Sequence, residues 1–168
     1  MPKDTSKYPS PDEFQDPLEN FEPKTYDDPV ERALAEETAD AIQHQPVATI
    51  AADTAIADAV EKLAGFHVAC LLVVEDDKLV GVFSDRDVLD KVALEHEQLK
   101  DHPVSEVMTR DPVYVYQTDP SAAALSVMAI SGFRHVPILD LDEKLTGIVS
   151  PQRVTAFLQK CLGEEKSE

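Results

Sequence analysis

The pattern of hydrophobic and polar positions in residues 46–102 changes period several times, as expected of a chain that alternates short strands with helices. The apolar run "VACLLVVE" is short and rich in β-branched residues, so it predicts a buried strand. The polar turn "DDK" separates it from the strand "LVGVF", which indicates a hairpin. The strand "PVATI" and the amphipathic helix "DTAIADAVEKLAGF" precede this hairpin, and the helix "SDRDVLDKVALEHEQL" follows it.

The same order of elements returns in residues 103–162, as "PVYVY", "DPSAAALSVMAIS", "RHVPILD", the turn "LDEK", "LTGIV" and "SPQRVTAFLQKCL". We therefore predict an α/β fold of α+β character, made of two β-α-β-β-α repeats at 46–102 and 103–162. Each repeat exposes too much apolar surface to fold alone. Two repeats packed face to face, related by a pseudo-two-fold axis, are expected to share one core.

The segments around the repeats are of three kinds. Residues 28–45 predict a lead-in helix, because Asp28 can cap it and Pro29 fits its first turn. Residues 1–27 are acidic and rich in proline, so a disordered tail is expected, with docking through its spaced aromatic residues as the alternative. Residues 163–168 form a charged C-terminal tail.

The formal net charge of −18 argues against binding to nucleic acid phosphates through a basic face. No run of 18 apolar residues predicts a membrane span, and "MPKDTSKYPSPDEF" lacks the features of a signal peptide. Cys70 and Cys161 are too few for a disulfide framework and have no metal-ligand spacing. We therefore expect a cytoplasmic protein that contacts neither membrane nor nucleic acid.

Catalytic motifs are missing from the sequence. Cys70 lies inside an apolar strand, as a structural cysteine does, and neither GxGxxG nor GxxxxGK[ST] occurs. The histidines lack the spacing of metal ligands. We therefore predict no enzyme, no bound metal and no catalytic cofactor. The five histidines are His44, His67, His96, His102 and His135.

The stretch "GVFSDRDVL" predicts a strand that ends in a helix start at Ser84. Amide groups at such a start attract a phosphate, and the Ser84 hydroxyl adds a donor. Asp87, one turn later, could accept both hydroxyls of a ribose, while Gly81 lets the backbone approach a base. Ser-x-x-Asp is equally close to a capping box, so the pattern alone leaves capping and nucleotide binding open.

The paired units, with "GVFSDRDVL", "VSEVMTRDPVYV" and "RHVPILD", resemble tandem CBS-domain proteins, also called Bateman modules, over about residues 44–162. In that family a Gly-x-x-Ser/Thr-x-x-Asp motif contacts adenosine. The resemblance implies that Ser84 faces the phosphate and that Asp87 holds the ribose. It therefore favours nucleotide binding over capping alone.

The resemblance also implies that each site borrows the segment that leads into the opposite repeat. Thr109 would contact the nucleotide, and Pro112 and Val113 would line the base pocket unless they serve only as strand start and core. Arg134 and His135 would lie near the phosphates unless they are simply solvated. The nucleotide-binding residues expected from the sequence are Gly81, Ser84, Arg86, Asp87, Thr109, Pro112, Val113, Arg134 and His135.

The second copy of the motif, "GIVSPQRVT", replaces the acid by Arg153. Arginine carries only donors, so it cannot accept hydrogen bonds from a ribose, and its bulk is expected to fill the pocket. Arg153 could still hold a phosphate from a ligand in the neighbouring site. We therefore expect one adenosine site per chain. Arg86 is expected to pair with phosphate or with Asp90.

The function expected from this resemblance is regulatory: energy sensing through AMP, ADP or ATP, in a homodimer formed through the helices. The output would pass to a separate downstream protein or through the acidic tail. Two alternatives remain, a ligand-independent dimerisation or protein-interaction module, and a sensor of S-adenosylmethionine or an NAD-type ligand.

Overall fold

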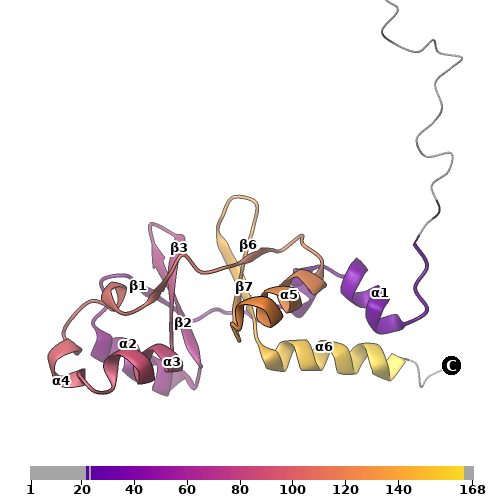
Figure 1. The fold of residues 1–168 in the computed structure, drawn as a ribbon. Coiled ribbons are helices and arrows are strands. Elements are labelled where there is room, and N and C mark those ends of the chain that lie inside the picture. The colour runs from indigo at the N-terminus through magenta and orange to yellow at the C-terminus, as the bar shows by residue number, and fades with distance from the viewer. Residues whose placement is uncertain (1–21, 23, 165–168) are drawn as a thin grey trace, which may run out of the picture.

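A computed structural model describes residue 22 and residues 24–164. The tail predicted for 1–27 and the charged tail at 163–168 lie mostly outside these residues. The chain forms two halves, each a small sheet with helices against one face (Figure 1). This arrangement confirms the predicted mixture of helices and strands.

The first sheet has the strand order β1-β2-β3-β4 and the second β5-β6-β7. In each sheet a parallel pair is followed by an antiparallel hairpin. The strands are β1 (Thr49–Ala51), β2 (Cys70–Glu75), β3 (Lys78–Ser84), β4 (Thr109–Arg110), β5 (Val115–Tyr116), β6 (Val136–Leu139) and β7 (Leu145–Val149). The helices are α1 (Pro29–Glu36), α2 (Ile56–Phe66), α3 (Asp85–Asp87), α4 (His96–Leu99), α5 (Ser121–Ser131) and α6 (Pro151–Glu164).

The two hairpins share an irregularity that makes the internal repeat visible. The register shifts between Val73 and Val74 in the β2–β3 pair, and between Ile138 and Leu139 in the β6–β7 pair. In both hairpins the glycine of the repeated motif, Gly81 or Gly147, sits close to that shift. A bulge conserved between two halves of one chain indicates a structural duplication rather than a chance similarity of sequence.

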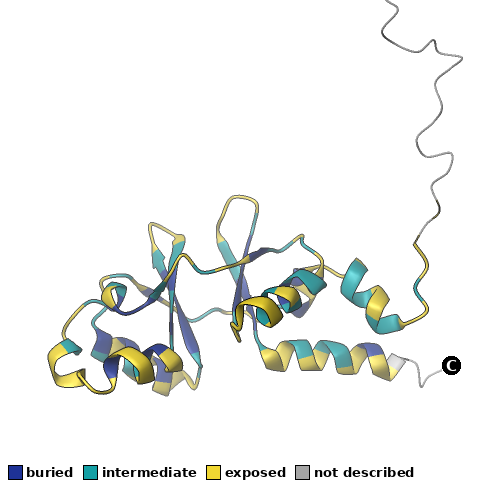
Figure 2. Ribbon diagram, in the orientation of Figure 1, coloured by how far each residue is buried: buried dark blue, intermediate teal, exposed yellow. Residues whose placement is uncertain are grey.

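The hydrophobic core is divided, which differs from the single shared core expected. One cluster fills the space between the first sheet and its helices, with Phe83 and Leu71 fully buried. A second joins the turn at Ala39–Ile42, α5 and α6 to the second sheet. A third, smaller cluster of Cys70, Leu72 and Ile148 joins the two sheets. Buried residues lie along the strands of both sheets (Figure 2). The division follows because helices cover one face of each sheet, and only the other faces meet.

The predicted lead-in helix is shorter than expected. Asp28 caps α1 by accepting from the Val30 amide, as predicted, but α1 ends at Glu36. The backbone of Glu37 is extended, and its carbonyl accepts a hydrogen bond from the Ser121 amide at 2.8 Å. A single 3₁₀ turn then covers Ala39–Ile42. Pairing with the second half of the chain therefore overrides the local helical preference.

The helix predicted after Ser84 is also interrupted. It continues from α3 into a π turn at Val88–Val92, then a tight turn, and resumes as α4. The Ala93 amide bonds the Val88 carbonyl, five residues back. π turns are rare and frequently lie beside functional sites. Here the turn follows Asp87 directly.

Each half is completed by a segment that leads into the other. β4 pairs with β3 of the first sheet, although the sequence assigned residues 103–162 to the second repeat. In the same way His44 pairs with Ile148 of the second sheet. Because of these two pairings, each half of the fold includes residues from the segment that precedes the other half.

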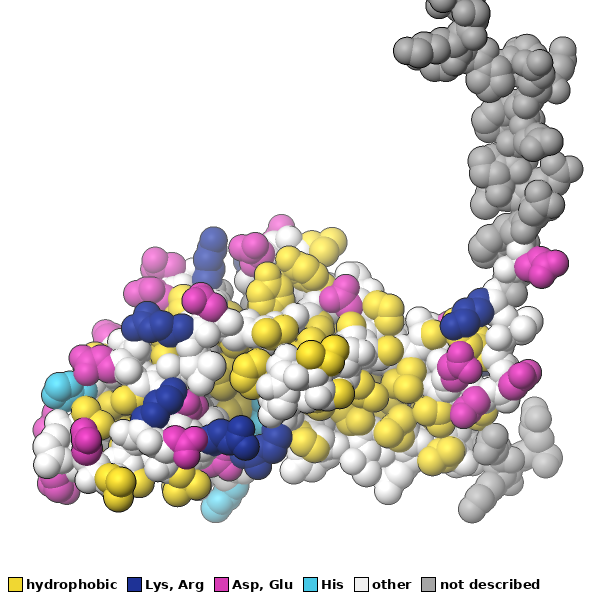
Figure 3. Space-filling view, in the orientation of Figure 1, with side chains coloured by type: hydrophobic (Ala, Val, Ile, Leu, Met, Phe, Trp, Pro, Cys, Tyr) yellow, Lys and Arg dark blue, Asp and Glu magenta, His cyan; other side chains and the backbone are white. Residues whose placement is uncertain are grey.

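The surface divides in the same way as the fold. On the face shown in Figure 3, charged side chains gather over the first half and hydrophobic ones over α5 and α6. Within the residues described, no helix is both long and apolar enough to cross a membrane.

Candidate functional site

A cavity of about 660 Å³, its open mouth included, lies where the two halves meet. Eight of the nine residues predicted from the sequence line it. The walls are formed by Cys70, Val82, Ser84, Asp85, Arg86, Asp87, Thr109, Pro112, Val113, Gly132, Phe133, Arg134 and His135.

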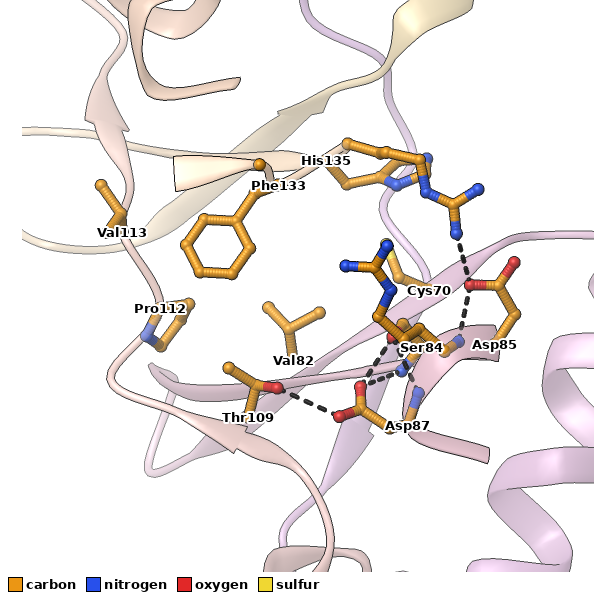
Figure 4. A pocket seen from close by; sticks show the side chains of 13 residues that line it. Cys70, Val82, Ser84, Asp85, Asp87, Thr109, Pro112, Val113, Phe133 and His135 are labelled. Atoms are coloured by element: carbon orange, nitrogen blue, oxygen red, sulfur yellow. Dashed lines mark hydrogen bonds and ion pairs between the residues drawn. The ribbon is translucent and has the colours of Figure 1, made fainter. Parts of the chain in front are cut away.

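The cavity has two chemically different ends (Figure 4). Pro112, Val113 and the Phe133 ring stand at one end, which is apolar. Asp85 and His135 stand at the other, where charged side chains gather. Asp87 lies at the base between them. Such a gradient suits a ligand with a flat apolar part at one end and a charged group at the other.

Asp87 is buried and accepts four hydrogen bonds. One carboxylate oxygen accepts from the amide and the hydroxyl of Ser84, at 2.9 and 2.7 Å. The other accepts from Lys91 Nζ at 2.7 Å and from the Thr109 hydroxyl at 3.1 Å. The Asp87 amide donates to the Ser84 hydroxyl, which completes a capping box. The capping alternative is thus realised in the structure, and it coexists with a position on the cavity wall.

The charge of Asp87 is stabilised by these donors. Burial by itself opposes ionisation, but hydrogen bonds from Lys91 and Ser84, together with the Lys91 charge, outweigh it. They hold the pKa of Asp87 below its usual value. Asp87 is therefore ionised at neutral pH, with the charge that a ribose-binding carboxylate requires.

This lowered pKa predicts a pH-dependent contribution to folding. A carboxyl whose pKa is lower in the folded chain stabilises it above the unfolded value of about 3.9, and loses that effect as the pH falls through the folded pKa. Asp87→Asn should cost about 1–2 kcal/mol at pH 7, since Lys91 stays partly solvated. Urea unfolding should show this difference shrinking as the pH is lowered from about 4. A difference that stays constant down to pH 3 would contradict the assignment.

The helix start at Ser84 differs from the anion site expected there. The Asp85 amide donates to the Ala69 carbonyl at 3.0 Å, and the Arg86 amide donates to the Asp85 carboxylate at 2.8 Å. The Asp87 amide bonds the Ser84 hydroxyl. All three amides are therefore used within the protein. Positive charge on this side of the cavity comes instead from the side chains of arginines.

Arg134 and His135 lie at the charged end of the cavity. Arg134 donates to the Asp85 carboxylate at 2.8 Å, with both side chains about half exposed. Burial, and then the Arg134 charge, lower the pKa of His135. Arg86 also lines the cavity, and no ion pair with Asp90 is present in the described part of the chain.

Cys70 is buried, and it is structural rather than reactive. Burial, and then the nearby Asp85, raise the pKa of its thiol to about 12. Cys161 is also buried and free. No group of three or more His, Cys, Asp or Glu side chains that could hold a metal ion occurs in the residues described.

Gly81 is the predicted residue that does not line the cavity. A Cβ at this position would overlap the Met108 Sδ atom. The space left by the missing side chain is therefore filled by Met108, which is buried in the first core. Gly81 permits this close packing of β3 against the segment before β4, and its link to the site is through Thr109, one residue beyond Met108.

The sequence did not single out several residues that the fold brings to the site. Cys70 pairs with Ser84 across the β2–β3 hairpin, so counting the hairpin register would have placed it there. Lys91 lies four residues after Asp87, a spacing that favours an ion pair on a helix. Phe133 follows the helix-ending Gly132, and no sequence pattern marks its direction.

The family model of the CBS domain matches residues 39–94 and 104–160, more than half of the chain. The chain belongs to the CBS domain family. The two matches correspond to the two halves of the fold, so the resemblance seen in the sequence is confirmed. The protein contains a tandem CBS module.

Several known proteins are similar in sequence to this chain. The CBS domain-containing protein CBSCBSPB5 of Arabidopsis thaliana is 33% identical over 96 residues, which is 56% of this chain and 18% of that protein. An uncharacterized 17.7 kDa protein of Acidianus ambivalens is 34% identical over 56% of this chain and 57% of its own length. The chain thus spans under a fifth of the first plant relatives that it matches.

Solved CBS structures share the fold. CBSX2 in complex with AMP is 29% identical, with a TM-score of 0.63 over 73% of this chain and 97% of that one. A protein with CBS domains from Burkholderia ambifaria is 26% identical, with a TM-score of 0.62 over 76% of this chain and 90% of that one.

The second CBS motif forms a cavity of its own. It includes Ser150 and Arg153, and its volume is about 1450 Å³ with its open mouth. Arg153 does not fill this space, contrary to the expectation from its bulk. Its guanidinium reaches across to His44 Nδ1 at 2.9 Å, and its amide lies 3.4 Å from the Ser150 hydroxyl. The helix start is therefore capped without an acid, and the cavity stays open.

Proposed function

We propose that this tandem CBS module is a non-enzymatic regulator that binds one adenine nucleotide, AMP, ADP or ATP, in the first cavity. The observation that carries the proposal is the position of Asp87. An ionised, buried carboxylate lies between an apolar wall and a wall with two arginines. A nucleotide has its base, ribose and phosphates in that same order.

The adenine fits the apolar end. Val82, Pro112, Val113 and the Phe133 ring offer flat or aliphatic surfaces, and Phe133 is only partly covered by the protein. A base stacked on an exposed aromatic ring buries apolar area that is otherwise in contact with water. Binding a purine at this end would therefore be favoured by the hydrophobic effect.

The ribose and phosphate fit the remaining walls. The two ribose hydroxyls would donate to Asp87, while Arg86 and Arg134 would attract the phosphate. His135 can donate an N–H to the same phosphate. The helix amides contribute little, since each already has a partner.

Binding at Asp87 provides a route to a conformational signal. All its acceptor positions are in use, so ribose hydroxyls must replace the Ser84 and Thr109 hydroxyls. The Thr109 contact is the longest of the four and links α3 to β4. Losing it would loosen the segment that joins the two repeats. A ligand that binds the loosened arrangement better shifts the population toward it.

The comparison with CBSX2 supports this ligand class. CBSX2 is 29% identical to this chain and was solved with AMP. Its fold matches over 73% of this chain and 97% of its own. The ligand of a similar protein gives a rational first choice for a binding test.

A homodimer is proposed as the assembly. Hydrophobic side chains remain exposed on the three long helices of the repeats: Phe66 on α2, Ile130 on α5 and Leu162 on α6. A dimer formed through these helices would remove the three side chains from water, which is favourable. A module that only dimerises, with Ser84 and Asp87 acting as a cap, is the rival function.

Titration calorimetry tests the proposal. AMP, ADP and ATP are titrated separately into the purified chain, alongside S-adenosylmethionine and NADH. We expect saturable binding of an adenine nucleotide with one molecule per chain. Absence of heat with all three nucleotides at millimolar concentration would favour the rival dimerisation module, and binding of S-adenosylmethionine or NADH alone would reassign the ligand.

A further inference from the structure

The second cavity carries a net positive charge, and the first does not. Two arginines and two aspartates line the first cavity, so their formal charges cancel. Two arginines, Arg134 and Arg153, and no acidic residue line the second. The chain as a whole has a net charge of −18, so a basic pocket is unusual in it, and such a pocket attracts anions.

The second cavity is also poor in groups that would hold a ribose. It has no carboxylate that could accept both hydroxyls of a ribose, and its charged or titratable side chains are the two arginines and the imidazoles of His44, His67 and His135. Arginine carries donors alone, so His44 Nδ1 must accept from Arg153, which places the His44 proton on Nε2. Donors without a carboxylate match an anion rather than a sugar.

The two cavities meet at the charged end of the first. Cys70, Arg134 and His135 line both. A phosphate bound near Arg134 from the first cavity therefore stands at the boundary of the second. Further phosphates attached to it would extend toward Arg153.

We propose that the second cavity receives the phosphate chain of a nucleotide whose adenosine lies in the first, so that the module prefers nucleoside triphosphates to monophosphates. This inference rests on the proposed function, because it needs the adenosine site. It assigns Arg153 the role of a phosphate-binding residue.

The contacts of the two arginines explain why added phosphates would strengthen binding. A first phosphate competes with the Asp85 carboxylate for Arg134, which is held at 2.8 Å. Arg153 makes no ion pair with any residue that the structure describes, and its partner is the His44 ring. A phosphate reaching Arg153 thus gains a charge-assisted hydrogen bond without displacing a carboxylate.

The test compares nucleotides that differ only in phosphate number. Dissociation constants for AMP, ADP and ATP are measured by calorimetry in EDTA at constant ionic strength. The variants are Arg153→Gln and the control Arg32→Gln, which removes the same charge from the exposed face of α1. We expect ATP to bind about tenfold more tightly than AMP in the unmodified chain, since one charge-assisted hydrogen bond contributes about 1.5 kcal/mol.

Arg153→Gln should weaken the binding of ATP about tenfold and change the affinity for AMP less than about twofold, while Arg32→Gln should change neither affinity. Inorganic tripolyphosphate should compete with ATP in the unmodified chain but not in Arg153→Gln. AMP binding serves as the internal control for folding.

Equal affinity for AMP and ATP, or an equal loss of affinity for both in Arg153→Gln, would overturn the inference and leave the adenosine site standing. Two ATP molecules per chain would also overturn it, because the second cavity would then hold its own nucleotide. Failure of AMP, ADP and ATP alike to bind would instead reject the proposed function.

Discussion

Replacing Asp87 by alanine is expected to weaken adenine-nucleotide binding about 100-fold. The carboxylate would accept both ribose hydroxyls, and two charge-assisted hydrogen bonds of about 1.5 kcal/mol each correspond to roughly that factor. Asp87→Asn should lose a similar amount, because the amide has the same shape but neither the charge nor a second acceptor oxygen. Calorimetric titration with the tightest-binding nucleotide measures the effect.

The control for Asp87 must separate binding from folding. Asp90→Ala removes a carboxylate three residues later, from an exposed position that does not line the cavity. It should bind as the unmodified chain does. Because Asp87 also completes the cap of Ser84, urea unfolding of each variant shows how much of the protein is folded during the titration. Unchanged affinity in a folded Asp87→Ala chain would mean that the residue serves only as a cap.

Replacing Phe83 by alanine is expected to destabilise the protein by about 3–5 kcal/mol. Phe83 is the largest fully buried side chain among the residues that the structure describes, and it lies in the core between the first sheet and its helices. The loss combines the transfer of the ring to water with the cavity that the ring leaves behind. Since small domains are stable by only about 5–15 kcal/mol, this is a large share of the total. Urea unfolding followed by circular dichroism measures it.

Phe66→Ala is the matched control for Phe83. It removes the same ring from the same half of the protein, but Phe66 is 58% exposed at the end of α2. It should cost less than about 1 kcal/mol. Equal costs for the two variants would show that the core around Phe83 is not the stabilising element described. Phe83 directly precedes Ser84, so its loss should also disturb the helix start beside the cavity.

The strands of both hairpins could be predicted from sequence because their signal is local. The run before "DDK" and the run after it are apolar and β-branched. β2 forms within the first run, and β3 covers the second run and one further residue at each end. The lead-in helix was less predictable. Its residues favour a helix beyond Glu36, but the hydrogen bond between Glu37 and Ser121 joins positions far apart in the chain. Propensity carries no information about such a distant partner.

The site shows the same limit. The motif identified Ser84 and Asp87, and the structure brings both to one cavity with Thr109. The structure also shows that Lys91 donates to Asp87, and that the amides at the helix start donate to groups within the protein. Phe133 faces the apolar end, which depends on how the loop after α5 leaves Gly132. Contacts of this kind depend on backbone direction, which residue type alone does not specify.

By itself, the sequence determined that the chain is a duplication, that Cys70 belongs to a buried strand, and that the two copies differ by an acid and an arginine. These follow from hydrophobic period and side-chain chemistry, which are local properties. Only the tertiary structure decided that Arg153 turns to His44, 109 residues away, and leaves its cavity open. It also decided that both cavities meet at Arg134. The physical reason is that a side chain takes the partner that packing brings within reach, and packing joins segments that are distant in sequence.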